Sequence, residues 1–121
     1  MGEAELKEWE GSILKQLKHI ADIEYQKLAW QGLIEGIADS PVETINTLYD
    51  WDFEGYIKYL FEKENSDNQL AQSMWILNQM IEEYPDSDLE VPKIWEDPRW
   101  IMVTRQAREI VDNWKSKEAN S

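Results

Sequence analysis

Apolar residues recur at helical spacing along most of the chain, and no stretch of four or more residues alternates like a strand between turn signals. We therefore predict an all-α fold. A first helix is expected over residues 3 to 19, with one apolar face formed by Leu6, Trp9, Ile13, Leu17 and Ile20. Asp22 is a candidate N-cap for a second helix over residues 23 to 38. The packing face of that helix would consist of Tyr25, Leu28, Ala29, Gly32, Leu33 and Gly36.

The clearest helix start combines Ser40 as an N-cap, Pro41 at the first helical position and an acid three residues after the cap. We expect this helix to begin at Pro41 and to end near Tyr49. A further helix follows, with Asp50 or Asp52 at its cap. Its apolar positions, spaced by three and four, are Phe53, Tyr56, Ile57, Leu60 and Phe61.

The second half of the chain predicts two longer helices joined by a loop. Capping signals at residues 66–69 open a helix over residues 67 to 84, which Pro85 stops. The apolar face of this helix is Leu70, Met74, Leu77, Ile81 and Tyr84. Residues 86 to 97 lack periodicity and predict a surface loop. The last helix begins at Pro98, and its apolar positions are Trp100, Val103, Ala107, Ile110 and Trp114.

The chain has 121 residues, enough for one hydrophobic core but not for two, and no linker or repeat divides it. We predict a single domain over residues 1–121, built as a bundle of about five helices, with residues 115–121 as a frayed tail. The longest uninterrupted apolar runs have four residues, against roughly 20 for a membrane span. The sequence shows no basic and apolar leader, so we expect a cytoplasmic protein that does not enter a membrane.

Residue usage excludes several kinds of site. The sequence contains no Cys and one His, which removes disulfides, thiolate zinc sites, cysteine nucleophiles and metal sites with two histidines. We interpret His19 as a surface or core-edge histidine. No phosphate-binding glycine loop, Gly-x-Ser-x-Gly elbow or His-Glu-x-x-His motif occurs. We therefore expect neither an enzyme nor a bound metal or cofactor.

One segment shares its first half with an EF-hand calcium loop. Asp50, Asp52 and Glu54 occupy loop positions 1, 3 and 5, and Gly55 occupies position 6. The match then fails, because position 12 is Phe61 where a bidentate Glu is required. The helical spacing of the apolar residues also requires this segment to be a helix. We therefore reject calcium binding here.

The formal net charge is −13, and its excess lies in the middle of the chain. Residues 41 to 90 carry −10, against −4 for residues 1 to 40 and +1 for residues 91 to 121. So acidic a chain is not expected to bind nucleic acid directly, because that affinity depends on clustered Lys and Arg. We expect three bases of the last helix to pair with the acidic middle: Arg99, Arg105 and Arg108.

Some acids are placed against local stability. Glu82 and Glu83 would lie near a helix C-terminus, where each opposes the helix dipole by about 0.3–1 kcal/mol. Three aromatic residues are interleaved with the central acids: Tyr49, Trp51 and Tyr84. A concentrated acidic face attracts a basic partner, and aromatic side chains provide the buried contacts that acids lack. Solubility remains the alternative explanation for each single acid.

The tryptophans divide into two informative groups. Three lie on predicted apolar faces and are assigned to the core: Trp9, Trp100 and Trp114. Three others lie off those faces or in loops, and we expect one or two of them to be exposed anchors: Trp51, Trp75 and Trp95.

Three segments and the overall composition carry a resemblance to a known class of protein. The segments are residues 28–36, the corner of residues 50–55, and residues 97–100 at the start of the last helix. Together they make the chain similar to the immunity proteins of bacterial contact-dependent growth inhibition and related polymorphic-toxin systems. The resemblance implies a cytoplasmic protein that binds a toxin domain, often a basic nuclease, and covers its active site or substrate groove. It assigns no functional residues.

We hypothesise an inhibitor that docks on a basic toxin domain through an acidic surface containing aromatic side chains. The predicted acidic surface consists of Tyr49, Asp50, Trp51, Asp52, Glu54, Glu82, Glu83, Tyr84, Asp86 and Asp88. Two other functions stay open. One is a nucleic-acid mimic that uses the same acids in place of phosphates, and the other is a structural subunit whose tryptophan-rich faces complete an oligomer.

Overall fold

The computed structural model describes residues 2–64 and 69–119, and within these ranges it contains six α-helices, two short 3₁₀ helices and no strand. The prediction of an all-α fold is confirmed. The α-helices are α1 Glu3–Ala21, α2 Ile23–Ala29, α3 Pro41–Asp50, α4 Phe53–Glu64, α5 Gln69–Glu83 and α6 Pro98–Ala119. The 3₁₀ helices, η1 Asp86–Glu90 and η2 Ile94–Glu96, lie between α5 and α6.

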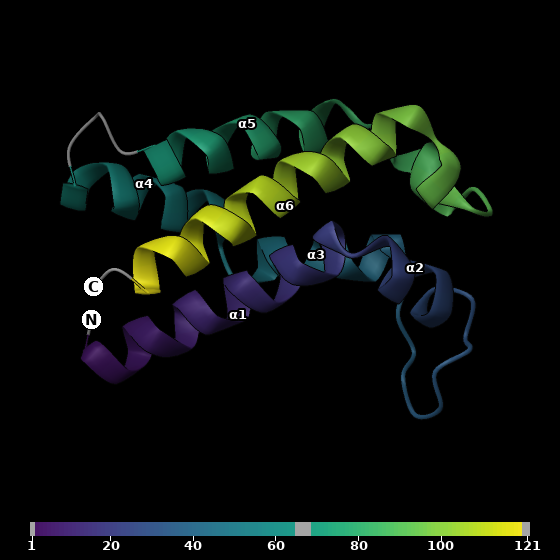
Figure 1. The fold of residues 1–121 in the computed structure, drawn as a ribbon, viewed down its shortest axis with the longest axis horizontal. Helices are drawn as coiled ribbons and strands as arrows, with labels where there is room; N and C mark the ends of the chain where they lie inside the picture. Colours follow the sequence, from purple (N-terminus) through teal and green to yellow (C-terminus); the bar gives the residue numbers. More distant parts are fainter. Residues whose placement is uncertain (1, 65–68, 120–121) are drawn as a thin grey trace.

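The long helix α6 lies between α1 and α5 and packs against both (Figure 1). Helix α3 also contacts α1, and α4 contacts α5, so the helices share one core. The beginning of α1 and the end of α6 lie at one end of the molecule (Figure 1). Helix α2, the loop of residues 30–40 and the η1–η2 segment lie at the opposite end (Figure 1).

The apolar faces predicted from helical spacing meet in this core. The largest side chains with almost no exposure come from five α-helices and η2, and they include Ile13, Leu17, Phe53, Tyr56, Leu77 and Trp100. Burying one large apolar side chain stabilises the fold by roughly 1.5–3 kcal/mol, so this set dominates the stability. Trp9, Phe61 and Leu70 pack against the edge of the core and are only partly buried.

Three helix starts follow the predicted capping signals. The side chains of Asp22, Ser40 and Asp52 each accept a hydrogen bond from the amide three residues further on, at 3.0–3.1 Å. Asp52, and not Asp50, therefore caps α4. The signals predicted for the start of α5 include residues 66–68, which lie outside the described residues. Helix α5 ends before Pro85, as predicted.

The second helix is much shorter than predicted, and residues 30–40 form a loop. Gly32 has a left-handed backbone (φ 74°), and its N–H donates to the carbonyl of Ala29 at 3.2 Å. The N–H of Leu33 donates to the carbonyl of Leu28 at 2.8 Å. These two bonds form a Schellman motif, which ends a helix at a left-handed glycine. The packing face predicted for this helix is therefore wrong, and Leu28 and Leu33 are exposed.

Side chains from α2 and α6 complete the C-terminal end of α1. Gln26 is fully buried, and its Nε2 donates to the carbonyls of His19 at 3.0 Å and Ile20 at 2.8 Å. Arg108 Nη2 donates to the carbonyl of Ala21 at 3.2 Å. The last carbonyls of a helix have no partner within it, so these bonds supply donors to the carbonyls of Ile20 and Ala21. They add a second donor to the carbonyl of His19, which also accepts from the N–H of Asp22 at 3.4 Å.

Candidate functional site

The corner between α3 and α4 presents three residues of the predicted acidic surface to solvent. Asp50 ends α3, Trp51 follows it, and Asp52 has a left-handed backbone (φ 55°) before α4 begins. Asp50 lies at the negative end of the α3 dipole, and the last turn of α3 contains no base. The side chain of Trp51 is 37% exposed. The corner therefore exposes two carboxylates and one indole.

Helix α1 contributes the rest of a shallow depression at this corner. Trp9 Nε1 donates to the main-chain oxygen of Trp51 at 2.6 Å, and the Trp9 ring meets Tyr56 edge-on with centroids 5.0 Å apart. The depression has a volume of about 390 Å³ and is lined by Glu5, Glu8, Trp9, Asp50, Trp51 and Asp52. Four of these six residues are acids and the other two are tryptophans. We call this depression the acidic corner.

The shape of the acidic corner depends on a glycine in α4. A Cβ at Gly55 would lie 2.0 Å from Asp52 Oδ2, so a larger residue displaces the carboxylate that caps the helix. A Cβ at Gly11, exposed in α1, meets nothing within 4 Å. Gly55 is therefore required by space, and its backbone φ is not positive.

The same substitution at these two glycines is expected to have opposite effects on stability. Gly11→Ala should raise the free energy of unfolding by about 0.5–1 kcal/mol, because alanine is the better helix former. Gly55→Ala should lower it by roughly 1 kcal/mol, because loss of the Asp52 cap and the forced rotamer outweigh that gain. Urea denaturation of both variants measures the difference. An equal gain in both would contradict the role assigned to Asp52.

A second group of predicted residues lies between α3, α4 and α5 and is joined by the buried Asn78. The hydroxyl of Tyr49 donates to Asn78 Oδ1 at 2.5 Å, and Asn78 Nδ2 donates to Glu54 Oε1 and Glu82 Oε1, each at 3.4 Å. Hydrogen bonding with the Glu54 carboxyl raises the pKa of Glu82, and burial raises the pKa of Tyr49. These side chains hold three helices together, which is a structural use of acids that we had assigned to a surface.

The third group closes the two ends of the η1–η2 segment. Arg99 Nη2 donates to Asp88 Oδ2 at 2.7 Å and to Asp97 Oδ2 at 2.9 Å. The hydroxyl of Tyr84 donates to Asp97 Oδ2 at 2.8 Å, and the bonds from Arg99 and Tyr84 lower the pKa of Asp97 to about 2. The predicted pairing with an acid of the middle region is confirmed for Arg99. For Arg105 and Arg108 it is wrong, because the ion pairs of the described residues include neither of them. Tyr84 is buried and Asp88 is neutralised, so neither fits the exposed acidic surface that we expected.

The ten predicted residues therefore divide into groups instead of forming one exposed surface. Glu83, at the end of α5, and Asp86, in η1, are exposed and take no part in the hydrogen bonds described above. Sequence reasoning missed Glu5 and Glu8, the α1 members of the acidic corner. The available signal was their position beside Trp9 on successive turns of one helix. The separation of 42 residues between Trp9 and Trp51 hid the contact.

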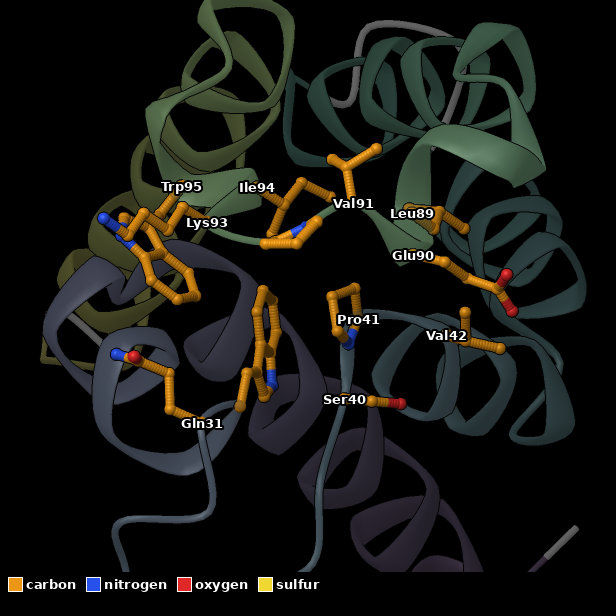
Figure 2. A pocket seen from close by; sticks show the side chains of 12 residues that line it. Gln31, Ser40, Pro41, Val42, Leu89, Glu90, Val91, Lys93, Ile94 and Trp95 are labelled. Atoms are coloured by element: carbon orange, nitrogen blue, oxygen red, sulfur yellow. The ribbon is translucent and has the colours of Figure 1, made fainter.

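A larger pocket lies at the other end of α3. It has a volume of about 510 Å³ and is lined by Trp30, Gln31, Ser40, Pro41, Val42, Leu89, Glu90, Val91, Pro92, Lys93, Ile94 and Trp95. Figure 2 shows residues of the η1–η2 segment facing Ser40, Pro41 and Val42 across the opening, with Lys93 and Trp95 at one end and Glu90 at the other. We call it the apolar pocket. Sequence analysis did not predict it.

The exposure of the remaining tryptophans follows from this arrangement. Trp51 and Trp75 are exposed, which confirms that one or two of the three tryptophans off the predicted faces reach the surface. Trp95 is 8% exposed, because η2 folds its side chain against the core beside the apolar pocket. Trp51 therefore remains the exposed aromatic residue of the acidic corner.

Other candidate chemistry receives no support from the geometry. His19 lies at the core edge, stacked on Tyr25 with ring centroids 4.2 Å apart, and burial lowers its pKa. Across residues 2–64 and 69–119, no three His, Asp or Glu side chains are grouped so that they could hold a metal ion. None of the described helices has an apolar stretch of the length that crossing a membrane requires.

Comparison of the chain with models of protein families, with curated proteins and with solved structures finds no match. The resemblance to immunity proteins stays a prediction.

Proposed function

We propose that this protein is an inhibitor of the immunity-protein kind, which binds a basic toxin domain through the acidic corner. The observation that carries the proposal is the composition of the depression: four carboxylates and two indoles, with no base among its six lining residues. The carboxylates attract Lys and Arg side chains over a distance, and the indoles provide contact area when the partner arrives. An arginine side chain gains further by lying against an indole face.

The charges of the acidic corner are not neutralised within the part of the chain that the structure describes. The ion pairs found there join Glu24 to Lys27 and Arg99 to Asp88 and Asp97, and none involves the corner. Asp50 also opposes the α3 dipole. A binding role accounts for an acid at a position that does not favour stability.

The proposal changes the membership of the predicted acidic surface. Asp50, Trp51 and Asp52 remain, and Glu5 and Glu8 join them from α1. Substituting Asp88, in contrast, would break an internal ion pair with Arg99 and would confuse folding with binding. The test therefore concentrates on the corner.

The test compares two variants that each remove four negative charges. The corner variant carries Glu5→Gln, Glu8→Gln, Asp50→Asn and Asp52→Asn. Asparagine tolerates a left-handed backbone and caps helices, so Asp52→Asn keeps the local geometry. The control variant neutralises four exposed acids outside the corner: Glu62→Gln, Glu83→Gln, Glu109→Gln and Asp112→Asn.

Association should be measured with an inactive toxin domain at two salt concentrations. A neighbouring gene for a large secreted protein with a variable C-terminal domain would identify that partner. The corner variant should associate about tenfold more slowly or worse, with a weaker salt dependence, because the local field that steers the encounter is lost. The association rate of the control variant should fall much less. Equal rates for the two variants would place the interface elsewhere, and competition by duplex DNA for a host DNA-binding protein would favour the nucleic-acid mimic.

A further inference from the structure

The first wall of the apolar pocket is fixed by a partly buried network around Asp39. Its carboxylate accepts hydrogen bonds from Trp30 Nε1 at 3.1 Å, from the hydroxyl of Tyr25 at 2.8 Å and from the hydroxyl of Thr44 at 3.0 Å. The Trp30 ring also lies against Trp100, with centroids 5.8 Å apart. The indole at this wall is thus held in place before any ligand arrives.

The second wall is the η1–η2 segment, which is fixed at both ends. Arg99 holds Asp88 at one end and Asp97 at the other. Leu89, Ile94 and Trp95 are buried beneath the segment and attach it to the core. Binding sites are usually preformed concavities with apolar walls and a few polar groups at the edge, and this pocket matches that description in volume and lining.

Exposed apolar side chains gather at the same end of the molecule as the pocket. Eight large apolar side chains are exposed in the described part of the chain, and four of them belong to this end: Leu28, Leu33, Ile37 and Val91. Val91 lines the pocket, and residues 30–40 form a loop whose two ends line it. Several exposed apolar side chains at one end of a molecule are typical of a protein-binding surface.

The charge around the pocket is strongly negative. Residues 30–43 and 86–96, which build it, contain seven acids and one base, Lys93. Asp39 and Asp88 are engaged in the internal bonds described above. The other five acids are exposed: Glu35, Glu43, Asp86, Glu90 and Glu96. Charge complementarity therefore selects a partner segment that is basic around an apolar residue.

We propose that the apolar pocket receives an apolar side chain from a basic segment of a protein partner. The pocket and the acidic corner lie at opposite ends of α3, whose 10 residues span about 15 Å. The inference rests on the proposed function for the positive charge of the partner. The pocket itself is defined independently of the corner.

Short synthetic peptides test the inference without the natural partner. The first has a central leucine flanked by lysines, the second has alanine in place of the leucine, and the third has glutamates in place of the lysines. Titration into the protein is followed by NMR at the indole N–H signals. The leucine peptide should shift the signals of Trp30 and Trp95 and leave that of Trp75, exposed on α5, in place. The other two peptides should bind roughly tenfold more weakly or worse, because each lacks one of the two interactions.

Two lysine substitutions on the protein provide the matched comparison. Val91→Lys places a longer side chain in the pocket, with a positive charge that repels the lysines of the peptide. Met102→Lys makes the same kind of change on α6, outside the pocket. Both positions are exposed, so both variants should fold. The first should abolish the response to the leucine peptide, and the second should preserve it.

Several outcomes would overturn the inference. One is the absence of shifts at Trp30 and Trp95, and another is an equal response to the alanine peptide. A third is a pocket that binds free indole, added as a small apolar probe, but not the leucine peptide. The corner variant should still give the Trp30 and Trp95 response. Failure of the pocket is therefore distinguishable from failure of the acidic corner, which is measured by association with the toxin domain.

Discussion

Replacing Gln26 with leucine is expected to lower the free energy of unfolding by about 3–5 kcal/mol. Gln26 is fully buried and makes three hydrogen bonds: two to the carbonyls of His19 and Ile20, and one from Trp100 Nε1 to its Oε1 at 3.0 Å. Leucine fills a similar volume but leaves the carbonyl of Ile20 and the indole N–H of Trp100 buried without partners. The carbonyl of His19 keeps only the N–H of Asp22, at 3.4 Å. Each such group costs about 1–3 kcal/mol. Urea denaturation measures the loss.

Two further variants separate this hydrogen-bond role from general packing. Gln31→Leu changes an exposed glutamine in the loop after α2 and should alter stability by no more than about 0.5 kcal/mol. Trp100→Phe removes the indole N–H that donates to Gln26. It should therefore lower the free energy of unfolding less in the Gln26→Leu variant than in the parent protein. Additive effects, or a Gln26→Leu variant as stable as the parent, would show that these bonds do not hold α1, α2 and α6 together.

The starts of the helices were predictable because capping is local. Ser40 and Asp52 each satisfy an amide three residues away, so the signal is complete within one short segment. The end of α2 is also determined locally, by Gly32, but the spacing of apolar residues predicted that the helix continues to residue 38. A glycine fits both a close-packed helix face and a left-handed stop, and only the hydrogen bonds of the Schellman motif distinguish them.

The candidate site was less predictable, because its parts come together only through tertiary contacts. Tyr84 lies on the predicted apolar face of its helix and is also beside acids, and the fold resolves this conflict in favour of burial. Asn78 gave no signal, although it is buried and joins three helices. Arg99 neutralises Asp88 across 11 positions in the sequence. Clusters of acids along the sequence do not reveal which of them form hydrogen bonds or ion pairs inside the fold.

The apolar pocket escaped prediction for a related reason. Residues 86–97 show no helical or strand period, so they predict only a loop. Their apolar members are arranged by two short 3₁₀ helices and by the left-handed Lys93 (φ 58°), which place Ile94 and Trp95 toward the core and leave Val91 in the pocket. Short 3₁₀ turns have too few residues to impose a readable pattern.

Replacing Asn78 with aspartate is expected to cost roughly 3–5 kcal/mol at about pH 7 and markedly less at about pH 5. The change keeps the shape of the side chain but turns the amide that donates to Glu54 and Glu82 into a third carboxylate, fully buried beside them. Glu82 already has a raised pKa because of its bond with Glu54.

The direction of the pH effect follows from proton binding. Carboxyl groups crowded in the folded protein hold protons more tightly than in the unfolded chain, so the pH-linked stability is present at low pH and is lost as the pH rises through the raised pKa values. Unfolding by urea at the two pH values measures this, with Asn46→Asp, an exposed change on α3, as the control that should remain within about 0.5 kcal/mol of the parent. A loss of equal size at both pH values would mean that Asn78 acts through packing, and that the Glu54 and Glu82 carboxyls do not repel the added charge.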